Sequence, residues 1–194
     1  MWKAVLRTLY RMMGVRGQPI KECDADAVAR TLSTQSGHIH YLYTEDAHHI
    51  IHLNNESKVG IKSIRTLIDK MTQEGLTHAI CVFTQPPTPF ARRFLINLHH
   101  ESDLHIEYFF SYELIFDITQ HKLMPKHERL TAAEKQALIH RYGKEEHCYP
   151  KIQLNDPMAR YLGLKIGDMI RVERNIPHLG RSVTYRIACA SVTK

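Results

Sequence analysis

The sequence predicts a protein of mixed α/β and α+β class with two domains: an N-terminal α/β domain with a mixed sheet over residues 1–120, and a small C-terminal α+β domain over residues 121–194. Three observations indicate this. Helical and strand patterns alternate in the first part, and a short helix precedes two strand patterns in the second. The charge balance also changes, because residues 1–120 carry 12 Lys and Arg against 13 Asp and Glu, whereas residues 121–194 carry 14 against 7.

Four helices are predicted in the N-terminal domain from apolar residues that recur at helical spacing. In the first helix the apolar residues form one face, and Arg7 and Arg11 lie opposite. The third helix is amphipathic and is expected to end at Gly75, since glycine suits the left-handed conformation of a helix end. The predicted helices cover residues 2–15, 24–31, 62–72 and 90–99.

Strands are predicted between these helices, where apolar and β-branched residues cluster. The first two would form a hairpin around the turn-like residues 44–47. The run Ala79–Phe83 is entirely apolar, which is typical of a strand buried on both faces of a sheet. The predicted strands cover residues 38–43, 49–53, 79–83, 105–110 and 114–118.

The C-terminal domain follows a short linker, which is predicted over residues 120–128. Thr131 and Glu134 have the spacing of a capping box, in which each side chain accepts a hydrogen bond from the backbone N–H of the other residue. Asp156 and Pro157 predict a second helix start, because Asp caps well and Pro needs no donor at the first helical position.

Gly163 and Gly167 are expected to end this second helix and to form a tight turn. Two strands are predicted next, over residues 169–172 and 183–188, and the loop between them contains proline and glycine. A short helix beside a small sheet is the α+β arrangement expected for the domain.

The composition predicts a folded, soluble protein, with 43% hydrophobic and 24% charged residues. No apolar run approaches the roughly 20 residues that span a bilayer, so we expect no membrane partner. The cysteines are far apart and form no paired motif, which predicts reduced thiols. They are Cys23, Cys81, Cys148 and Cys189.

Two catalytic or metal-binding alternatives compete with ordinary surface roles. His38, His40 and His52 could approach one another across the predicted hairpin, together with the neighbouring His48-His49 pair, as zinc binding needs. No acidic or cysteine ligand stands at a matching offset, so solvent-facing histidines are favoured and no metal is expected.

Asp46, Glu56 and Lys58 resemble the carboxylate-plus-lysine site of restriction-type nucleases, in which the carboxylates hold a divalent ion. Short matches of this kind are common in loops, so a metal-dependent nuclease is an alternative and not the favoured function. The basic C-terminal half leaves a further alternative, a stand-alone nucleic-acid adaptor.

Residues 86–93, with the sequence PPTPFARR, are the strongest functional candidate in the N-terminal domain. Thr88 can cap the following helix, and Arg92 and Arg93 lie in its first turn. A capped helix start offers free N–H groups to phosphate, and the two arginines add charge and bidentate contacts. On the residues alone, a plain surface helix start is equally expected.

Three C-terminal segments occur in a recognisable order: MPKHERLTAAEK at 124–135, NDPMARYLGLKIGD at 155–168, and GRSVTYRI at 180–187. Together they resemble the assembly domain of the fifth subunit shared by the eukaryotic nuclear RNA polymerases. The archaeal counterpart of that subunit has only this C-terminal domain. In the N-terminal domain, Val59–Lys62 and Thr88–Ala91 resemble family segments more loosely. Both domains are present, as in the eukaryotic members.

The resemblance implies a non-catalytic polymerase subunit. Its N-terminal domain would be a jaw that grips downstream double-stranded DNA through Thr88, Pro89, Arg92 and Arg93. Its C-terminal domain would anchor that jaw to the largest subunit and so to the rest of the complex. The magnesium ions of catalysis would belong to the large subunits, so no cofactor is expected in this chain. The implied interface residues are Pro125, Lys126, His127, Arg129, Asp156, Pro157, Tyr161 and Arg181.

Several departures from the family pattern indicate a divergent member. Arg16-Gly17 is followed by Gln-Pro in place of Tyr, and Phe90 replaces a small polar residue. The stretch between the first helix and the sheet is shorter than in the family, and residues 190–194 extend past the usual end. A deep-branching eukaryote would imply the nucleus, whereas a large DNA virus would imply cytoplasmic factories and the virion. The viral origin is slightly favoured on these departures.

Overall fold

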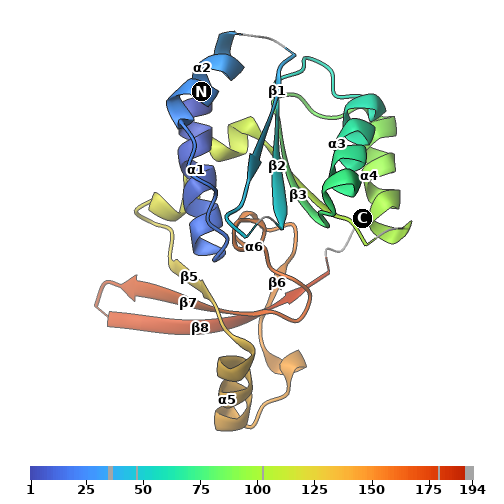
Figure 1. The fold of residues 1–194 in the computed structure, drawn as a ribbon. Coiled ribbons are helices and arrows are strands. Elements are labelled where there is room, and N and C mark those ends of the chain that lie inside the picture. The colour runs from blue at the N-terminus through green and yellow to red at the C-terminus, as the bar shows by residue number, and fades with distance from the viewer. Residues whose placement is uncertain (35–36, 47, 102, 179, 191–194) are drawn as a thin grey trace. The chain divides into compact units, whose positions relative to one another are not determined.

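The computed structural model describes residues 1–190 apart from residues 35–36, 47, 102 and 179. The chain forms two compact units, Met1–Phe116 and Asp117–Lys194, and each has its own sheet (Figure 1). Their architectures confirm the predicted fold class. The boundary after residue 120, with domains that fold alone, stays a prediction. In the described part of the chain, no helix has the length and apolar character needed to cross a bilayer.

The sheet of the first unit has the order β1-β2-β3-β4, with β1 antiparallel to β2 and the other neighbours parallel. The predicted hairpin is present, although Ala47 of its turn lies outside the described residues. β3 is buried along most of its length, as its apolar sequence predicts. The strands are β1 (Ile39–Tyr43), β2 (His49–Asn54), β3 (His78–Phe83) and β4 (His105–Phe110).

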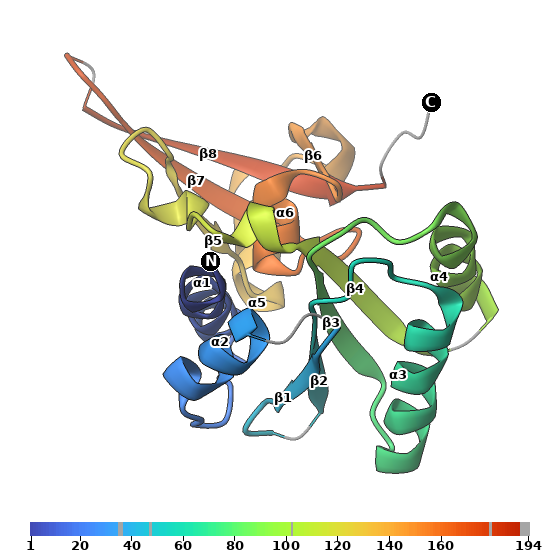
Figure 2. The same ribbon diagram turned by 90° about the horizontal axis from the view of Figure 1, so that it is seen from above.

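Helices cover both faces of this sheet, with α1 and α2 on one face and α3 and α4 on the other (Figure 2). Gly75 ends α3 with a left-handed φ of 68°, as predicted. The helices are α1 (Trp2–Val15), α2 (Ala25–Thr34), α3 (Ile61–Glu74) and α4 (Pro89–Glu101). The buried cluster under α3 and α4 includes Ile50, Ile64, Leu67, Ala79, Ala91 and Leu95.

The parallel register places three histidines in a row at the first residues of β2, β3 and β4. His49 pairs with His78, and His78 pairs with His105. Their ring centroids are 4.9 Å and 5.0 Å apart. The sequence did not predict this row, because it depends on how strands far apart in the chain align and not on any local spacing.

The strand predicted over residues 114–118 is wrong. The Glu113 carboxylate accepts a hydrogen bond from the Phe110 amide at 2.9 Å, and the Asp117 carboxylate accepts one from the Thr119 amide at 3.0 Å. Such side-chain bonds compete with a strand ladder for backbone donors and favour turns. The segment contains two 3-10 helices instead, η1 (Ser111–Leu114) and η2 (Ile118–Gln120).

The second unit is built on a sheet of order β5-β7-β8-β6, in which β6 is parallel to β8 and the other pairs are antiparallel. The predicted linker over residues 120–128 is too long, because its last residues pair with β7 and form most of β5. The strands are β5 (Lys126–Arg129), β6 (Lys151–Gln153), β7 (Met169–Ile176) and β8 (Gly180–Cys189). The helices are α5 (Ala132–Tyr142), η3 (Glu146–Cys148) and α6 (Pro157–Leu162).

The predicted helix caps of the second unit are confirmed. The Thr131 hydroxyl accepts from the Glu134 amide at 3.3 Å, and the Glu134 carboxylate accepts from the Thr131 amide at 2.8 Å, which completes the capping box at α5. The Asp156 carboxylate accepts from the Met158 amide at 2.8 Å and so caps α6. Gly163 ends α6 with a left-handed φ of 62°.

Candidate nucleic-acid interface and assembly surface

The start of α4 is held by Thr88 and Pro89. The Thr88 hydroxyl accepts a hydrogen bond from the Ala91 amide at 3.3 Å, and the Thr88 carbonyl accepts one from the Arg92 amide at 2.9 Å. Pro89, the first residue of the helix, has no N–H to satisfy and a fixed φ. The predicted cap is therefore confirmed, and the first turn is stiff.

The first turns of α4 divide into a buried and an exposed set. Ala91 is fully buried in the cluster under the helix. Arg92 and Arg93 are exposed, and the Phe90 side chain is 73% exposed. The four predicted DNA-binding residues thus lie together at one helix start, where both guanidinium groups face solvent.

The loop before α4 is tied to the loop that joins β2 and α3. The Thr88 amide donates to the Val59 carbonyl at 3.1 Å. The Thr84 hydroxyl donates to the Asn54 carbonyl at 3.2 Å and to the Asn55 side-chain oxygen at 3.1 Å. Both loops follow the carboxyl ends of parallel strands, which is where open α/β sheets bind ligands.

The candidate nuclease site is not assembled. Asp46 precedes β2 and Glu56 follows it, so the two carboxylates lie at opposite ends of the strand. The Glu56 carboxylate already accepts hydrogen bonds from the Asn54 amide group at 3.0 Å and from the Ser63 hydroxyl at 2.5 Å. A bound divalent ion needs both carboxylates together, so the geometry gives the nuclease alternative no support.

The histidines considered for zinc do not converge either. The register places His40 opposite Leu53 and His52 opposite Tyr41, so the two imidazoles point to opposite faces of the sheet. Among the residues that the structure describes, no group of three or more His, Cys, Asp or Glu side chains is placed to hold a metal ion.

The eight predicted assembly residues lie on or beside β5, on α6 and its cap, and on β8. Tyr161 is only 3% exposed, so its ring is packed inside the chain. Asp156 uses one carboxylate oxygen to cap α6, and the His127 ring is 2.8 Å from the Pro125 carbonyl. The exposed members are Lys126, Arg129, Pro157 and Arg181.

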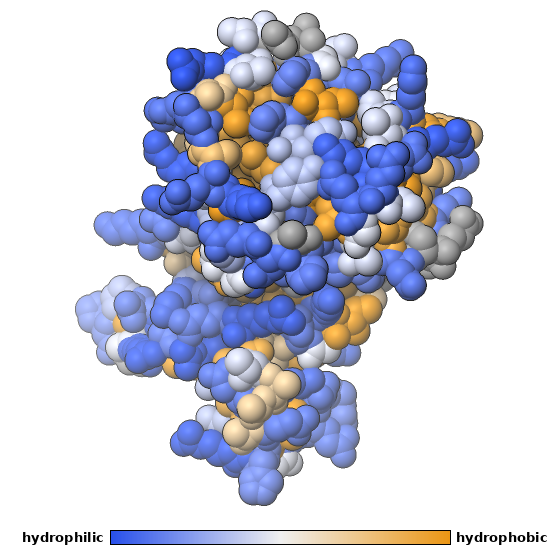
Figure 3. Space-filling model, viewed as in Figure 1, coloured by the Kyte–Doolittle hydropathy of each residue, from blue (hydrophilic) through white to orange (hydrophobic). Residues whose placement is uncertain are grey.

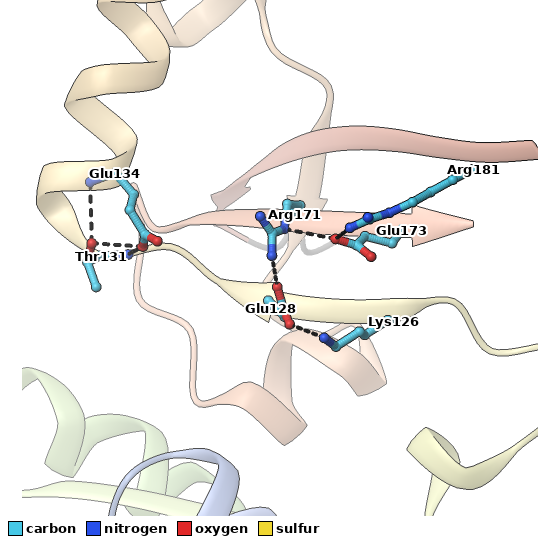
Figure 4. Close-up of polar contacts among 7 residues, drawn as sticks. All are labelled: Lys126, Glu128, Thr131, Glu134, Arg171, Glu173 and Arg181. Carbon is cyan, nitrogen blue, oxygen red and sulfur yellow. Dashed lines mark hydrogen bonds and ion pairs between the residues drawn. The ribbon is translucent and has the colours of Figure 1, made fainter. Parts of the chain in front are cut away.

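A chain of alternating charges connects β5, β7 and β8 (Figure 4). Glu128 lies opposite Arg171 in the strand register and forms ion pairs with Arg171 and Lys126. Glu173 pairs with Arg171 at 3.2 Å and with Arg181 at 2.5 Å. The hydrogen bonds from Lys126 and Arg171 lower the pKa of the Glu128 carboxyl. A partner that contacts Lys126 or Arg181 therefore meets side chains that already form ion pairs with Glu128 or Glu173.

Hydrophilic side chains cover most of the visible face of the β7–β8 ribbon (Figure 3). Arg174, Asn175 and Thr184 are exposed along it, and among the described residues of the two strands only Ile176 and Val183 add large exposed apolar groups. Such a surface suits water or a polar partner, because burying it without complementary polar groups would cost free energy.

Comparisons with known proteins point to a single family. A family model described as RNA polymerase Rpb5, C-terminal domain, matches residues 116–188. A relative from Dictyostelium discoideum, named subunit rpabc1 of DNA-directed RNA polymerases I, II and III, is 41% identical over 130 residues, which cover 67% of this chain and 66% of that protein.

Two nematode relatives, each named subunit RPABC1 of DNA-directed RNA polymerases I, II and III, extend this finding. The protein from Caenorhabditis elegans is 29% identical over 202 residues, which cover 96% of this chain and 94% of that protein. The protein from Caenorhabditis briggsae is 36% identical over 132 residues, which cover 68% of this chain and 62% of that protein. The chain thus aligns with about two thirds of two relatives and with nearly all of the third.

Proposed function

We propose a function from one premise: the chain belongs to the RNA polymerase Rpb5 family and is a non-catalytic subunit of a multisubunit DNA-directed RNA polymerase that acts in transcription. In this proposal the first unit grips duplex DNA ahead of the active site through sequence-independent phosphate contacts. The second unit anchors the chain to the largest subunit. The nucleotidyl-transfer site and its magnesium ions belong to the large subunits.

The observation that carries the DNA-binding part is the start of α4. Thr88 caps a helix of 13 residues, and Arg92 and Arg93 extend from its first turns into solvent. The partial positive charge of a helix start and two guanidinium groups together favour phosphate. No base-reading side chain is needed, because phosphate contacts position a protein on DNA without reading its sequence.

The assembly part is supported by the match of residues 116–188 to the family's C-terminal domain. Exposed charged residues on β5 and β8 give that unit a surface on which electrostatic complementarity can steer association. The relatives named above are subunits of RNA polymerases I, II and III in cellular eukaryotes, which supports the nucleus as the place of action. They give no support to a viral factory or virion, so that expectation stays a prediction.

Replacing Arg92 and Arg93 together with Ala tests the DNA-binding part. Each lost phosphate contact removes about one unit from the slope of log affinity against log salt. The double variant is therefore expected to bind downstream DNA more weakly, with a slope lower by about two, equally for unrelated DNA sequences. Affinity of purified polymerase for a duplex template, measured over a salt series, gives this slope.

The matched control replaces Arg7 and Lys21 with Ala, since both residues are exposed and lie away from α4. The control is expected to keep the slope of the unaltered chain, and both variants should enter the polymerase normally. An unchanged slope for the Arg92 and Arg93 variant, or a loss that depends on DNA sequence, would refute phosphate binding at this helix start.

A further inference from the structure

We propose that Lys58 and Lys62 extend the DNA-binding surface from α4 to the start of α3. The proposal rests on the proposed function, and it defines one cationic surface that spans two helix starts. DNA phosphates are its ligand, and Lys58 and Lys62 bind them as Arg92 and Arg93 do. We call these four residues the two-helix cationic surface.

The two helix starts are held side by side by hydrogen bonds between their loops. The amide of Thr88, the cap of α4, donates to the carbonyl of Val59 at 3.1 Å. Val59 directly precedes Gly60, the N-cap residue of α3. The Thr84 side chain adds bonds to Asn54, the last residue of β2, and to Asn55 on the same loop. Lys58 and Lys62 therefore flank the residue to which the α4 cap is bonded.

The helices behind the surface are also packed together, so the cations are carried on a rigid support. Ile64 and Leu67 of α3 lie in the same buried cluster as Ala91 and Leu95 of α4. Both helices begin at the carboxyl edge of the parallel strands, so their positive ends face the same side of the sheet. Two helix starts side by side favour anions more than one does.

The four cations are exposed, and no described acidic residue neutralises them. In the described part of the chain, no ion pair uses Lys58, Lys62, Arg92 or Arg93. The nearest acidic residue in the α3 loop is Glu56, and its carboxylate already accepts bonds from Asn54 and Ser63. Positive charge therefore stays available to a ligand.

The arrangement fits a repeating polyanion better than a small phosphate compound. A small anion is usually enclosed by several donors, whereas these side chains are open to solvent on two helices. Solvent-exposed lysine and arginine side chains can contact the regularly spaced phosphates of duplex DNA without reading its bases. Each such contact releases condensed counterions. The surface therefore predicts more phosphate contacts than the α4 loop alone provides.

The test measures binding of the full chain to a fluorescently labelled duplex over a salt series. Replacing Lys58 and Lys62 together with Ala is expected to lower the salt slope by about two, and adding Arg92→Ala and Arg93→Ala should lower it by about four. Replacing both lysines with Arg should keep the slope, since the charge is retained. Circular dichroism confirms that each variant is folded before binding is measured.

The outcomes separate this inference from the proposed function. If the arginine pair lowers the slope and the lysine pair does not, the inference is overturned and the proposed function stands. If neither pair of substitutions changes the salt slope, both the inference and the proposed DNA-binding function are refuted. The control with Arg7→Ala and Lys21→Ala should leave the slope unchanged, and an equal loss there would overturn the inference, because binding would then follow net charge alone.

Discussion

His52 is a histidine that the fold keeps neutral. It is buried beside the rings of Tyr41 and Phe83, at centroid distances of 5.2 Å and 6.3 Å. The side-chain oxygen of Asn54 accepts from the Glu56 amide at 2.7 Å, so its NH2 group must face His52 Nε2, 3.4 Å away. That nitrogen is therefore an acceptor, and protonating it would place two donors face to face.

Acid is therefore expected to destabilise the first unit through His52. Burial lowers its pKa from 6.5 to about 4, so the unfolded chain binds a proton at pH 5 that the folded chain does not. The contribution of neutral His52 to the free energy of unfolding is fully present above pH 6.5 and is lost as the pH falls. The expected loss is about 2 kcal/mol between pH 7 and pH 5. Urea unfolding of the full chain at both pH values measures this loss.

The variant His52→Gln provides the decisive comparison. Its stability at pH 7 is expected to be lower, but its further loss on going to pH 5 should shrink by about 2 kcal/mol. His140→Gln, at an exposed position on α5, is the control and should keep the full pH dependence. The assignment is wrong if His52→Gln loses as much stability on acidification as the unaltered chain. Burial also lowers the pKa of His49, which adds a residual dependence in both proteins.

At the scale of elements, local chemistry was predictable and register was not. The caps at Thr131 and Asp156 are confirmed, since each depends on groups two or three residues apart. β5 and β6 were missed, because four and three residues are too few to show alternation and both strands exist only through their partners. The histidine row starting at His49 was missed for the same reason.

In the candidate DNA site, too, the local features were predictable from the sequence and the contacts between distant segments were not. The sequence predicted the α4 start from Thr88, Arg92 and Arg93, because a cap and a first-turn charge are local features. It did not place Lys58 and Lys62 beside them, since that depends on the bond between Thr88 and Val59, which joins two loops. The nuclease alternative arose for the same reason, because the spacing in the sequence gave no sign that the carboxylates of Asp46 and Glu56 lie at opposite ends of β2.

The short helix α6 depends on packing as well as on its caps, and Tyr161 tests this. A helix of six residues is marginal by itself. Tyr161 is 3% exposed, so Tyr161→Ala is expected to lower the unfolding free energy of the chain by about 3 kcal/mol, as for other large-to-small core changes. Chemical denaturation measures the change. Tyr142→Ala, at a half-exposed site on α5, should cost much less.

The sequence also left open a role for Tyr161 at the subunit interface. Normal stability of the Tyr161→Ala chain together with weak incorporation into polymerase would assign the ring to that interface. Reduced stability with incorporation in proportion to the folded fraction would assign it to packing. Normal stability with normal incorporation would contradict both assignments.

At the scale of the whole molecule, the net charge is distributed unevenly between the two units. The first 120 residues are close to neutral, and the basic excess lies in residues 121–194. Charge alone would therefore assign nucleic acid to the second unit. The proposed DNA surface lies instead on the nearly neutral first unit, where a few cations are concentrated at two helix starts. Local placement, and not net charge, decides where phosphate binds in this proposal.

The second unit is expected to fold and to bind the polymerase by itself. Residues 117–194 have their own four-stranded sheet and their own buried cluster, in which Tyr149, Met169 and Ile187 pack with apolar residues of α5. A domain of this size buries a smaller share of its surface than a large one, so its stability should be modest. A fragment of residues 117–194 should unfold cooperatively on heating, as circular dichroism would show.

The same fragment should enter the polymerase in place of the full chain, because the anchor is proposed to lie wholly in this unit. Polymerase assembled with it should keep its catalytic activity but lose the salt-dependent part of downstream DNA binding that the two-helix cationic surface supplies. Residues 1–116 serve as the matched fragment, and they should not co-purify with the large subunits. A folded fragment of residues 117–194 that fails to bind them would show that the anchor needs both units.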